Sequence, residues 1–182
     1  MALTRVRFVA GRAGQWKIDE VRVIRGETLS DASRLSHGEE PALPSTEGGN
    51  WVLEGVRSSE KYTERGERDE LTKVQPDLGR PTSLRGALIP ICKRPSWWAL
   101  AQDERRALFE DRSHHIKIGS KYLPAIARRL YHARELGGPF DFLTWFEFAP
   151  ENAGAFDELV GRLRETEEWR YVDREVEIRV RR

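Results

Sequence analysis

The fold class is decided by the stretch Phe140-Asp-Phe-Leu-Thr-Trp-Phe-Glu-Phe148, which contains four phenylalanines in nine residues. Successive side chains of a β-strand point to opposite faces of the sheet. In a strand, all four phenylalanines share one face, while Leu143 and Trp145 point to the other. Because both faces carry large apolar side chains, we expect a strand that other elements cover on both sides.

The residues that follow this strand predict a helix and then another strand. Pro150 opens the helix, which runs to about Thr166 and turns four apolar side chains inward, namely Phe156, Leu159, Val160 and Leu163. Residues 171–181 then alternate apolar and charged side chains, with Val176, Ile178 and Val180 on one face. This alternation predicts a half-exposed strand.

Two helices are predicted before the phenylalanine-rich strand. Ser96 is the expected N-cap of the first helix, which ends near Asp111. The second helix covers residues 120–136, where Pro124 is tolerable only in the first turn. The pair Gly137-Gly138 then ends it.

Strands and loops are predicted in the first half of the chain. Residues 86–92 read as a buried strand, and Pro90 confines it to a sheet edge or a strand end, because proline cannot donate a backbone hydrogen bond. Residues 51–56 form a short strand. Residues 36–50 are rich in turn formers and predict a surface loop, and the highly charged residues 58–70 are expected to lie largely in water.

The N-terminal residues predict an antiparallel pair of strands. Val6, Phe8 and Ala10 share one face of the first strand, and a turn follows at residues 11–14. Val21 and Val23 then resume the period of two. The stretch therefore reads as a hairpin.

The order of these elements indicates an α+β fold. From Gly86 onward the order is strand, helix, helix, strand, helix, strand, which fits a ferredoxin-like antiparallel sheet with helices on one face. We divide the chain into a strand-rich part, residues 1–85, and a ferredoxin-like part, residues 86–182, that together form one compact unit. If the sheet curls, it leaves an apolar pocket under the helices, which aromatic residues from 140–148 could line.

Composition excludes several classes of protein. The 182 residues include 31 Lys+Arg and 30 Asp+Glu, so the chain lacks the basic excess of a dedicated nucleic-acid binder. No apolar run approaches the roughly 20 residues that span a bilayer. The N-terminus lacks a signal segment, which predicts a cytoplasmic protein, or a periplasmic one if a leader was removed. The single cysteine, Cys92, excludes an internal disulfide and a zinc site built mainly from thiolates.

Histidines are the best candidates for chemistry, and the chain has four of them, His37, His114, His115 and His132. An adjacent pair in a connection is by itself most often an exposed loop feature. The neighbourhood changes that reading, because the pair lies within Arg112-Ser-His-His-Ile-Lys-Ile-Gly119 and is followed by Leu123-Pro-Ala-Ile-Ala-Arg-Arg-Leu-Tyr-His132. Together with the strand 140–148, these segments resemble the short-subunit branch of the chlorite dismutase family.

The resemblance runs from about Gly86 to the C-terminus and more thinly through the first 80 residues. It implies a ferredoxin-like fold of the dimeric α/β barrel superfamily, a homodimer, haem b, and conversion of chlorite to chloride and dioxygen. In the family a histidine ligates the haem iron, and an arginine thirteen positions later stands over the open face. That arginine is here Arg128, which makes His115 rather than His114 the ligand. Arg128 would hold chlorite and hypochlorite, since its guanidinium stays protonated and can fork onto an oxyanion.

Five further residues take roles that the resemblance implies. A carboxylate before the last strand binds the other ring nitrogen of the ligand histidine, and Glu168 fits this place, with Glu167 as the alternative. Lys93 joins the same network, and Trp97 packs against the haem. Gln75 could hydrogen-bond Arg128, and Tyr62 resembles the segment that contacts the haem propionates. Without the resemblance, each of these residues would read as ordinary surface or core.

Two other functions stay open at the level of the sequence. One is a coproheme decarboxylase-like activity, against which Arg128 argues, because those relatives lack an arginine at this place. The other is a non-catalytic haem-binding carrier or sensor. Other catalytic motifs are lacking, since the chain contains no Gly-x-Gly-x-x-Gly, no P-loop and no His-Glu-x-x-His.

Overall fold

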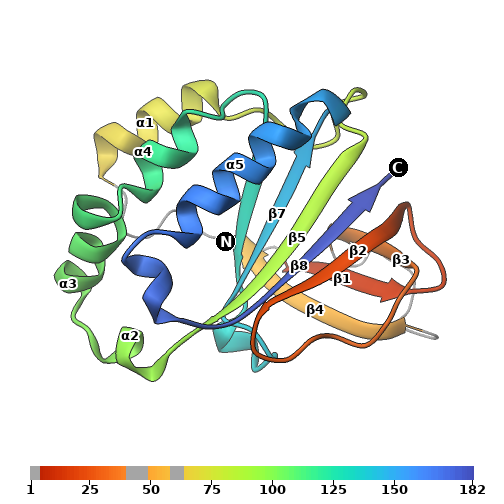
Figure 1. The fold of residues 1–182 in the computed structure, drawn as a ribbon, viewed down its shortest axis with the longest axis horizontal. Helices are drawn as coiled ribbons and strands as arrows, with labels where there is room; N and C mark the ends of the chain where they lie inside the picture. The colour runs from red at the N-terminus through yellow and green to blue at the C-terminus, as the bar shows by residue number, and fades with distance from the viewer. Residues whose placement is uncertain (1–4, 40–48, 58–63) are drawn as a thin grey trace.

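The computed structural model describes residues 5–39, 49–57 and 64–182. In these residues eight strands form a closed antiparallel barrel in the order β1-β3-β2-β8-β5-β7-β6-β4 (Figure 1). The strands are β1 (Arg5–Gly11), β2 (Trp16–Arg25), β3 (Arg34–Glu39), β4 (Gly49–Arg57), β5 (Arg85–Lys93), β6 (Ala127–His132), β7 (Phe142–Phe148) and β8 (Val172–Arg181).

The closed barrel overturns the expected open ferredoxin-like α+β sheet. The sheet closes because β4 pairs with both β1 and β6, and β3 joins β1 to β2. One of the closing strands, β3, overlaps the predicted loop 36–50, whereas β4 contains the predicted strand 51–56 and begins two residues earlier. The predicted hairpin of β1 and β2 is also wrong, because β3 lies between these two strands in the barrel.

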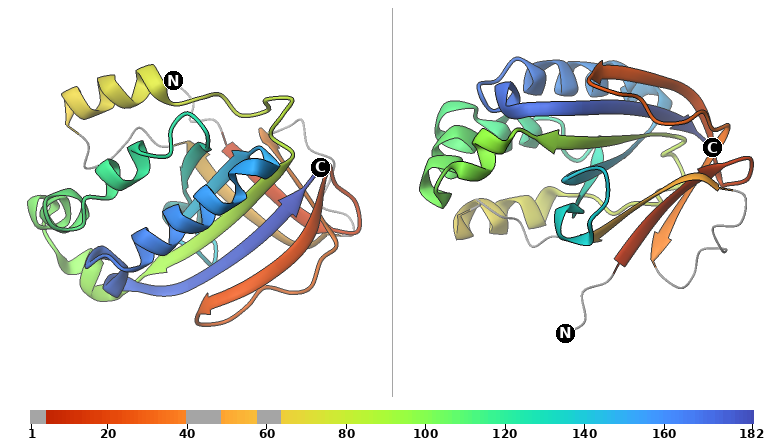
Figure 2. Two further views of the ribbon diagram at one scale, coloured as in Figure 1. Left: turned by 45° about the horizontal axis from the view of Figure 1, so that its top comes forward. Right: turned by 90° about the horizontal axis from the view of Figure 1, so that it is seen from below.

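The helices lie together against the outside of the barrel (Figures 1 and 2). The α-helices are α1 (Arg65–Val74), α2 (Pro95–Ala99), α3 (Gln102–Arg106), α4 (His115–Ser120) and α5 (Ala153–Arg164). Shorter or irregular turns are the π-helix η1 (Ala107–Arg112) and the 3-10 helices η2 (Arg134–Leu136), η3 (Pro150–Asn152) and η4 (Glu168–Tyr171). No helix in the described ranges is long and apolar enough to cross a membrane.

Strand β7 separates two apolar cores, as its sequence predicts. Leu143 and Trp145 point into the barrel, whereas Phe146 and Phe148 pack against Phe156 of α5 on the helix side. Phe140 is the exception, because it precedes β7 and packs with the barrel interior. The cavity described below lies on the helix side of this strand.

Of the three predicted helices, the structure contradicts one, divides another into short pieces and confirms the third. The predicted helix 120–136 is wrong, because residues 127–132 form strand β6 between β4 and β7. The helix predicted to start at Ser96 is broken into α2, α3 and η1, and its N-cap is Arg94. The helix after Pro150 is confirmed as η3 followed by α5.

Two strand environments also differ from expectation. Pro90 lies in the middle of β5, which is flanked by β7 and β8 and is therefore not an edge strand. The β8 pairing skips Ile89 and Pro90 without a change of register, because Leu88 pairs with Ile178 and Ile91 with Glu175. Strand β8 is not half-exposed either, since Glu175 and Glu177 are 1% and 0% exposed.

Candidate functional site

His115 is the first residue of α4 and turns its ring into the molecule. The preceding residue, His114, has a left-handed backbone (φ 52°) and an exposed side chain, so the chain changes direction between the two histidines. The His115 side chain is 13% exposed. Its ring stacks on Phe109 of η1, with centroids 4.5 Å apart. The two adjacent histidines therefore have opposite environments.

Glu168 binds one nitrogen of the His115 ring. Glu168 Oε2 lies 2.8 Å from His115 Nδ1. Burial raises the pKa of the Glu168 carboxyl, but the Lys93 ammonium and the His115 ring outweigh this effect and hold that pKa at about 2. The ionised carboxylate can only accept hydrogen bonds, so Nδ1 carries a proton, and in the neutral ring Nε2 then has the lone pair.

Three contacts hold the Glu168 carboxylate and its turn in place. Lys93, at the end of β5, donates from Nζ to Glu168 Oε1 at 2.7 Å. The same ammonium lies 4.3 Å from the centroid of the Trp97 ring, which is buried. The backbone N–H of Glu168 donates to Ser113 Oγ at 2.9 Å. The alternative carboxylate, Glu167, is instead paired with Arg112 at 3.0 Å on the surface.

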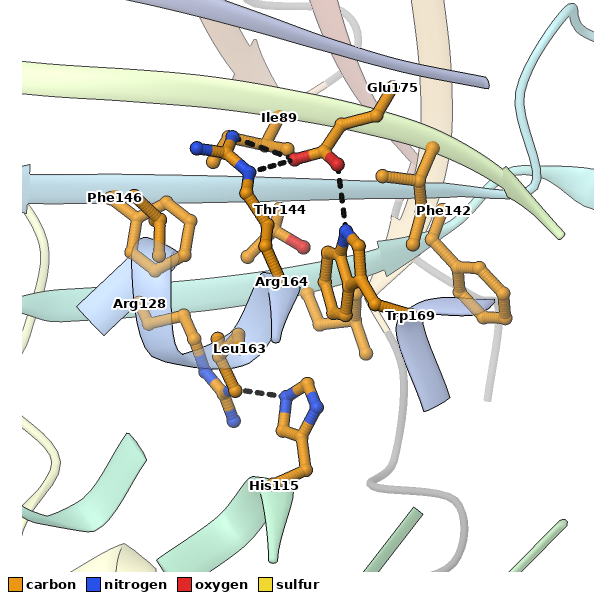
Figure 3. A pocket seen from close by; sticks show the side chains of 13 residues that line it. Ile89, His115, Arg128, Phe142, Thr144, Phe146, Leu163, Arg164, Trp169 and Glu175 are labelled. Atoms are coloured by element: carbon orange, nitrogen blue, oxygen red, sulfur yellow. Dashed lines mark hydrogen bonds and ion pairs between the residues drawn. The ribbon is translucent and has the colours of Figure 1, made fainter. Parts of the chain in front are cut away.

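Arg128 faces His115 from strand β6. Its NH1 atom lies 3.4 Å from His115 Nε2, so the guanidinium meets the nitrogen that Glu168 leaves open (Figure 3). Gln75, which follows α1, donates from Nε2 to the backbone carbonyl of Arg128 at 2.6 Å. Gln75 therefore holds the strand at Arg128, and this contact is to the backbone and not to the guanidinium.

A largely apolar cavity opens beside these groups, between the helices and the barrel. It measures about 650 Å³ when the space at its open mouth is included. Alternate residues of three strands form its floor, among them Ile89 and Ile91 of β5, Leu130 of β6, and Phe142, Thr144 and Phe146 of β7. A second cavity of about 450 Å³ also has Arg128 and Phe146 in its wall, together with Gln75 and Leu123. Arg128 thus borders both spaces.

The structure brings together most of the candidate residues from the sequence. His115 and Arg128 line one cavity, and Glu168 and Gln75 bind these two residues. Lys93 binds Glu168, and Trp97 lies against Lys93. Tyr62 lies outside the described residues.

Sequence reasoning missed two aromatic rings beside His115 and an ion pair in the cavity wall. Phe109 stacks on the ring, and Trp169 lies next to it with centroids 6.3 Å apart. The ion pair of Arg164 and Glu175 lines the far side of the cavity. Trp169 directly follows Glu168, so its position next to the expected carboxylate was the available signal. Glu175 gave no signal, because a glutamate in an alternating strand reads as solvent-facing.

The chain is similar to one family model and to several solved structures. The family model described as chlorite dismutase matches residues 50–182. The dimeric chlorite dismutase of Nitrobacter winogradskyi is 54% identical, with a TM-score of 0.90 over 97% of this chain and 99% of that one.

More distant structures share the fold. A mutant chlorite dismutase of Candidatus Nitrospira defluvii is 20% identical, with a TM-score of 0.71 over 100% of this chain and 92% of that one. The same organism's enzyme in complex with imidazole is 21% identical, with a TM-score of 0.68 over 98% and 91% of the two chains. No curated protein matched the chain.

Proposed function

The chain belongs to the chlorite dismutase family, and from this premise we propose how its residues serve the haem-dependent conversion of chlorite to chloride and dioxygen. The observation that carries the proposal is the His115 ring. One nitrogen is bound by a buried carboxylate, and the other faces a charged arginine beside an apolar cavity. We propose haem b as the cofactor and His115 as its iron ligand.

The residues present fit a haem. A neutral imidazole is a common ligand of haem iron, and a carboxylate on Nδ1 would fix its tautomer and raise its basicity. The apolar floor of the cavity suits a flat macrocycle. When bound, the haem iron supplies the redox chemistry that breaks a Cl–O bond and allows the O–O bond to form.

On the ligand side, the chain's residues hold a proton and a charge in place. Glu168 keeps the His115 proton on Nδ1, and Lys93 keeps Glu168 ionised. Trp97 lies against the Lys93 ammonium and separates it from water. This buried series of contacts gives the imidazole partial anionic character, which favours the ferric state of a ligated iron.

Arg128 would supply the positive charge that binds the substrate. Its guanidinium carries a fork of N–H donors that can bind chlorite and retain a released oxyanion, and the apolar walls around it strengthen that attraction by excluding water. Gln75 holds the Arg128 backbone. We assign Arg128 and Gln75 to substrate binding and its support. Tyr62 keeps its proposed role at the haem propionates.

We also propose that the enzyme is a homodimer. The support is the relative from Nitrobacter winogradskyi, which is described as dimeric and matches nearly the whole length of both chains.

The test of this function is a pair of histidine variants. His115→Ala should abolish stable haem loading, and the purified protein should release no oxygen from chlorite at an oxygen electrode. His114→Ala is the matched control, because His114 is exposed and should keep both haem and activity. Loss of haem from His114→Ala but not from His115→Ala would identify His114 as the ligand. If the wild type retains haem but releases no oxygen, the protein is a haem carrier and not a chlorite-converting enzyme.

A further inference from the structure

We propose that Glu175 is a positioning residue for the haem ligand, acting through the indole of Trp169. The proposal rests on the function above, since it takes His115 as the ligand. Glu175 does not touch His115. It binds Trp169, which lies beside the His115 ring and directly follows Glu168 in the chain.

Glu175 is a buried carboxylate with both oxygens engaged. It is 1% exposed on β8 and forms part of the cavity wall (Figure 3). The Trp169 indole donates from Nε1 to Glu175 Oε2 at 2.7 Å. Arg164 of α5 donates from Nε and NH2 to Glu175 Oε1 at 2.9 and 2.7 Å. Two N–H groups of the Arg164 guanidinium bind Oε1 and hold the carboxylate in one orientation. Its Oε2 is therefore held in position to accept the hydrogen bond of the indole.

The Trp169 ring forms a wall beside His115. The two rings are inclined by 26°, with centroids 6.3 Å apart. The Lys93 ammonium, which binds Glu168, also lies 5.6 Å from the Trp169 ring. Trp169 therefore contacts the same group of residues that holds the His115 proton.

The backbone explains why this wall needs an anchor. Glu168 and Trp169 are consecutive residues of η4, a single 3-10 turn. Such turns are short and have poor hydrogen-bond geometry, so their position depends on side-chain contacts. The Glu168 carboxylate binds the turn to His115 and Lys93, and the Trp169 indole binds it to β8. Loss of the second contact would let the turn shift and misalign Glu168 with His115.

Glu177 provides a matched control on the same strand. It lies two residues further along β8, so its side chain points to the same face, and it is 0% exposed. It binds the same arginine, with Arg164 NH2 at 2.5 Å from Oε2, and its Oε1 accepts from Arg179 Nε at 2.5 Å. Glu177 thus shares the burial and the ion pair of Glu175, whereas the indole of Trp169 is bound by Glu175.

The experiment measures haem loss from the purified holoprotein to excess apomyoglobin, in parallel with thermal unfolding. We expect Glu175→Gln to speed haem loss on the order of tenfold, the lower end of what removing a partner of a metal ligand costs. The frequency of the iron–histidine vibration should also shift. Glu177→Gln should change neither quantity, even if it lowers the unfolding temperature as much.

Trp169→Phe tests the same contact without disturbing Arg164. It keeps a ring and removes the N–H donor, so haem loss should accelerate as in Glu175→Gln, and the double variant should add little to either single one. Equal effects of the Glu175 and Glu177 variants, or no effect of Trp169→Phe, would overturn the proposal. Haem loss unaffected by His115→Ala would instead overturn the assignment of the ligand.

Discussion

Arg128 and His115 meet at 3.4 Å although they lie thirteen positions apart in the chain. Between them lie the short helix α4, a turn and the start of β6. The sequence placed Arg128 on a helix, and it lies on a strand. The pairing of the two residues survives this error, because it came from the family's spacing and not from the secondary structure.

Replacing Arg128 should lower both the catalytic efficiency and the total oxygen released before inactivation, and the two effects can be measured separately. Loss of a charged hydrogen bond to chlorite costs about 1.5–3 kcal/mol, so Arg128→Ala should lower kcat/KM roughly 10- to 100-fold. If the guanidinium also retains hypochlorite, the variant should release less total oxygen before it is inactivated. Methionine, which scavenges hypochlorite, should then prolong its activity more than that of the wild type.

Arg128→Lys is the control for charge alone. A single ammonium lacks the planar fork, so this variant should recover only part of the loss. Full oxygen yield from Arg128→Ala, with no hypochlorite in solution, would show that another residue retains the oxyanion.

Glu168→Gln should raise the ferric–ferrous reduction potential of the bound haem. The neutral amide can no longer draw the Nδ1 proton as strongly, so the imidazole becomes a weaker donor and the ferric state loses stability. We expect a rise of at least about 59 mV, which corresponds to a tenfold change in a one-electron equilibrium. Spectroelectrochemical titration measures it. Glu167→Gln is the control, because Glu167 pairs with Arg112 on the surface, and an equal shift there would exclude a specific role for Glu168.

Strand β6 shows why some strands and helices could be predicted from the sequence and others could not. Its Arg128 side borders the cavity under the helices, and its Tyr131 side packs in the barrel interior. Because both faces are covered, the strand has no alternation of polar and apolar residues, and its pattern fits a helix equally well. Strand β7 was predictable because its large apolar residues alternate between two cores, and α5 because one of its faces is apolar.

The other missed elements depend on contacts distant in sequence. β3 has few apolar residues and gains its hydrogen bonds from β1, so residues 34–39 alone do not indicate a strand. Glu175 and Glu177 can be buried because Arg164, from helix α5, reaches both carboxylates. The candidate site was predictable where a family motif marked its residues. The division of the chain after residue 85 stays a prediction.

Gly55 tests how tightly β4 fits beside β6. A Cβ added at this position would lie 2.7 Å from Tyr131 Cβ, so Gly55→Ala should destabilise the fold by about 1–3 kcal/mol. Chemical denaturation measures the free energy of unfolding. Gly161 of α5 is the matched control, because nothing lies within 4 Å of its added Cβ. Gly161→Ala should stabilise the protein by up to about 1 kcal/mol through helix propensity, and a similar gain from Gly55→Ala would show that β4 and β6 are further apart.

The proposed homodimer can be tested directly by measuring the mass of the assembly. Light scattering of the purified holoprotein should give about twice the 21.0 kDa mass of one chain. A closed point-group dimer keeps this mass when the protein is concentrated. A mass near that of a pentamer, or one that rises steadily with concentration, would contradict the dimer.

The barrel closes unevenly, and this has a consequence for how the molecule opens. β2 and β3 share two residue pairs, and the described part of β4 shares two with β6, whereas β2 pairs with β8 along most of its length. Opening at these two seams disrupts few hydrogen bonds, and local openings of this kind govern amide hydrogen exchange. We therefore expect backbone amides at these two seams to exchange with deuterium sooner than those of β5 and β7, which are paired along most of their length.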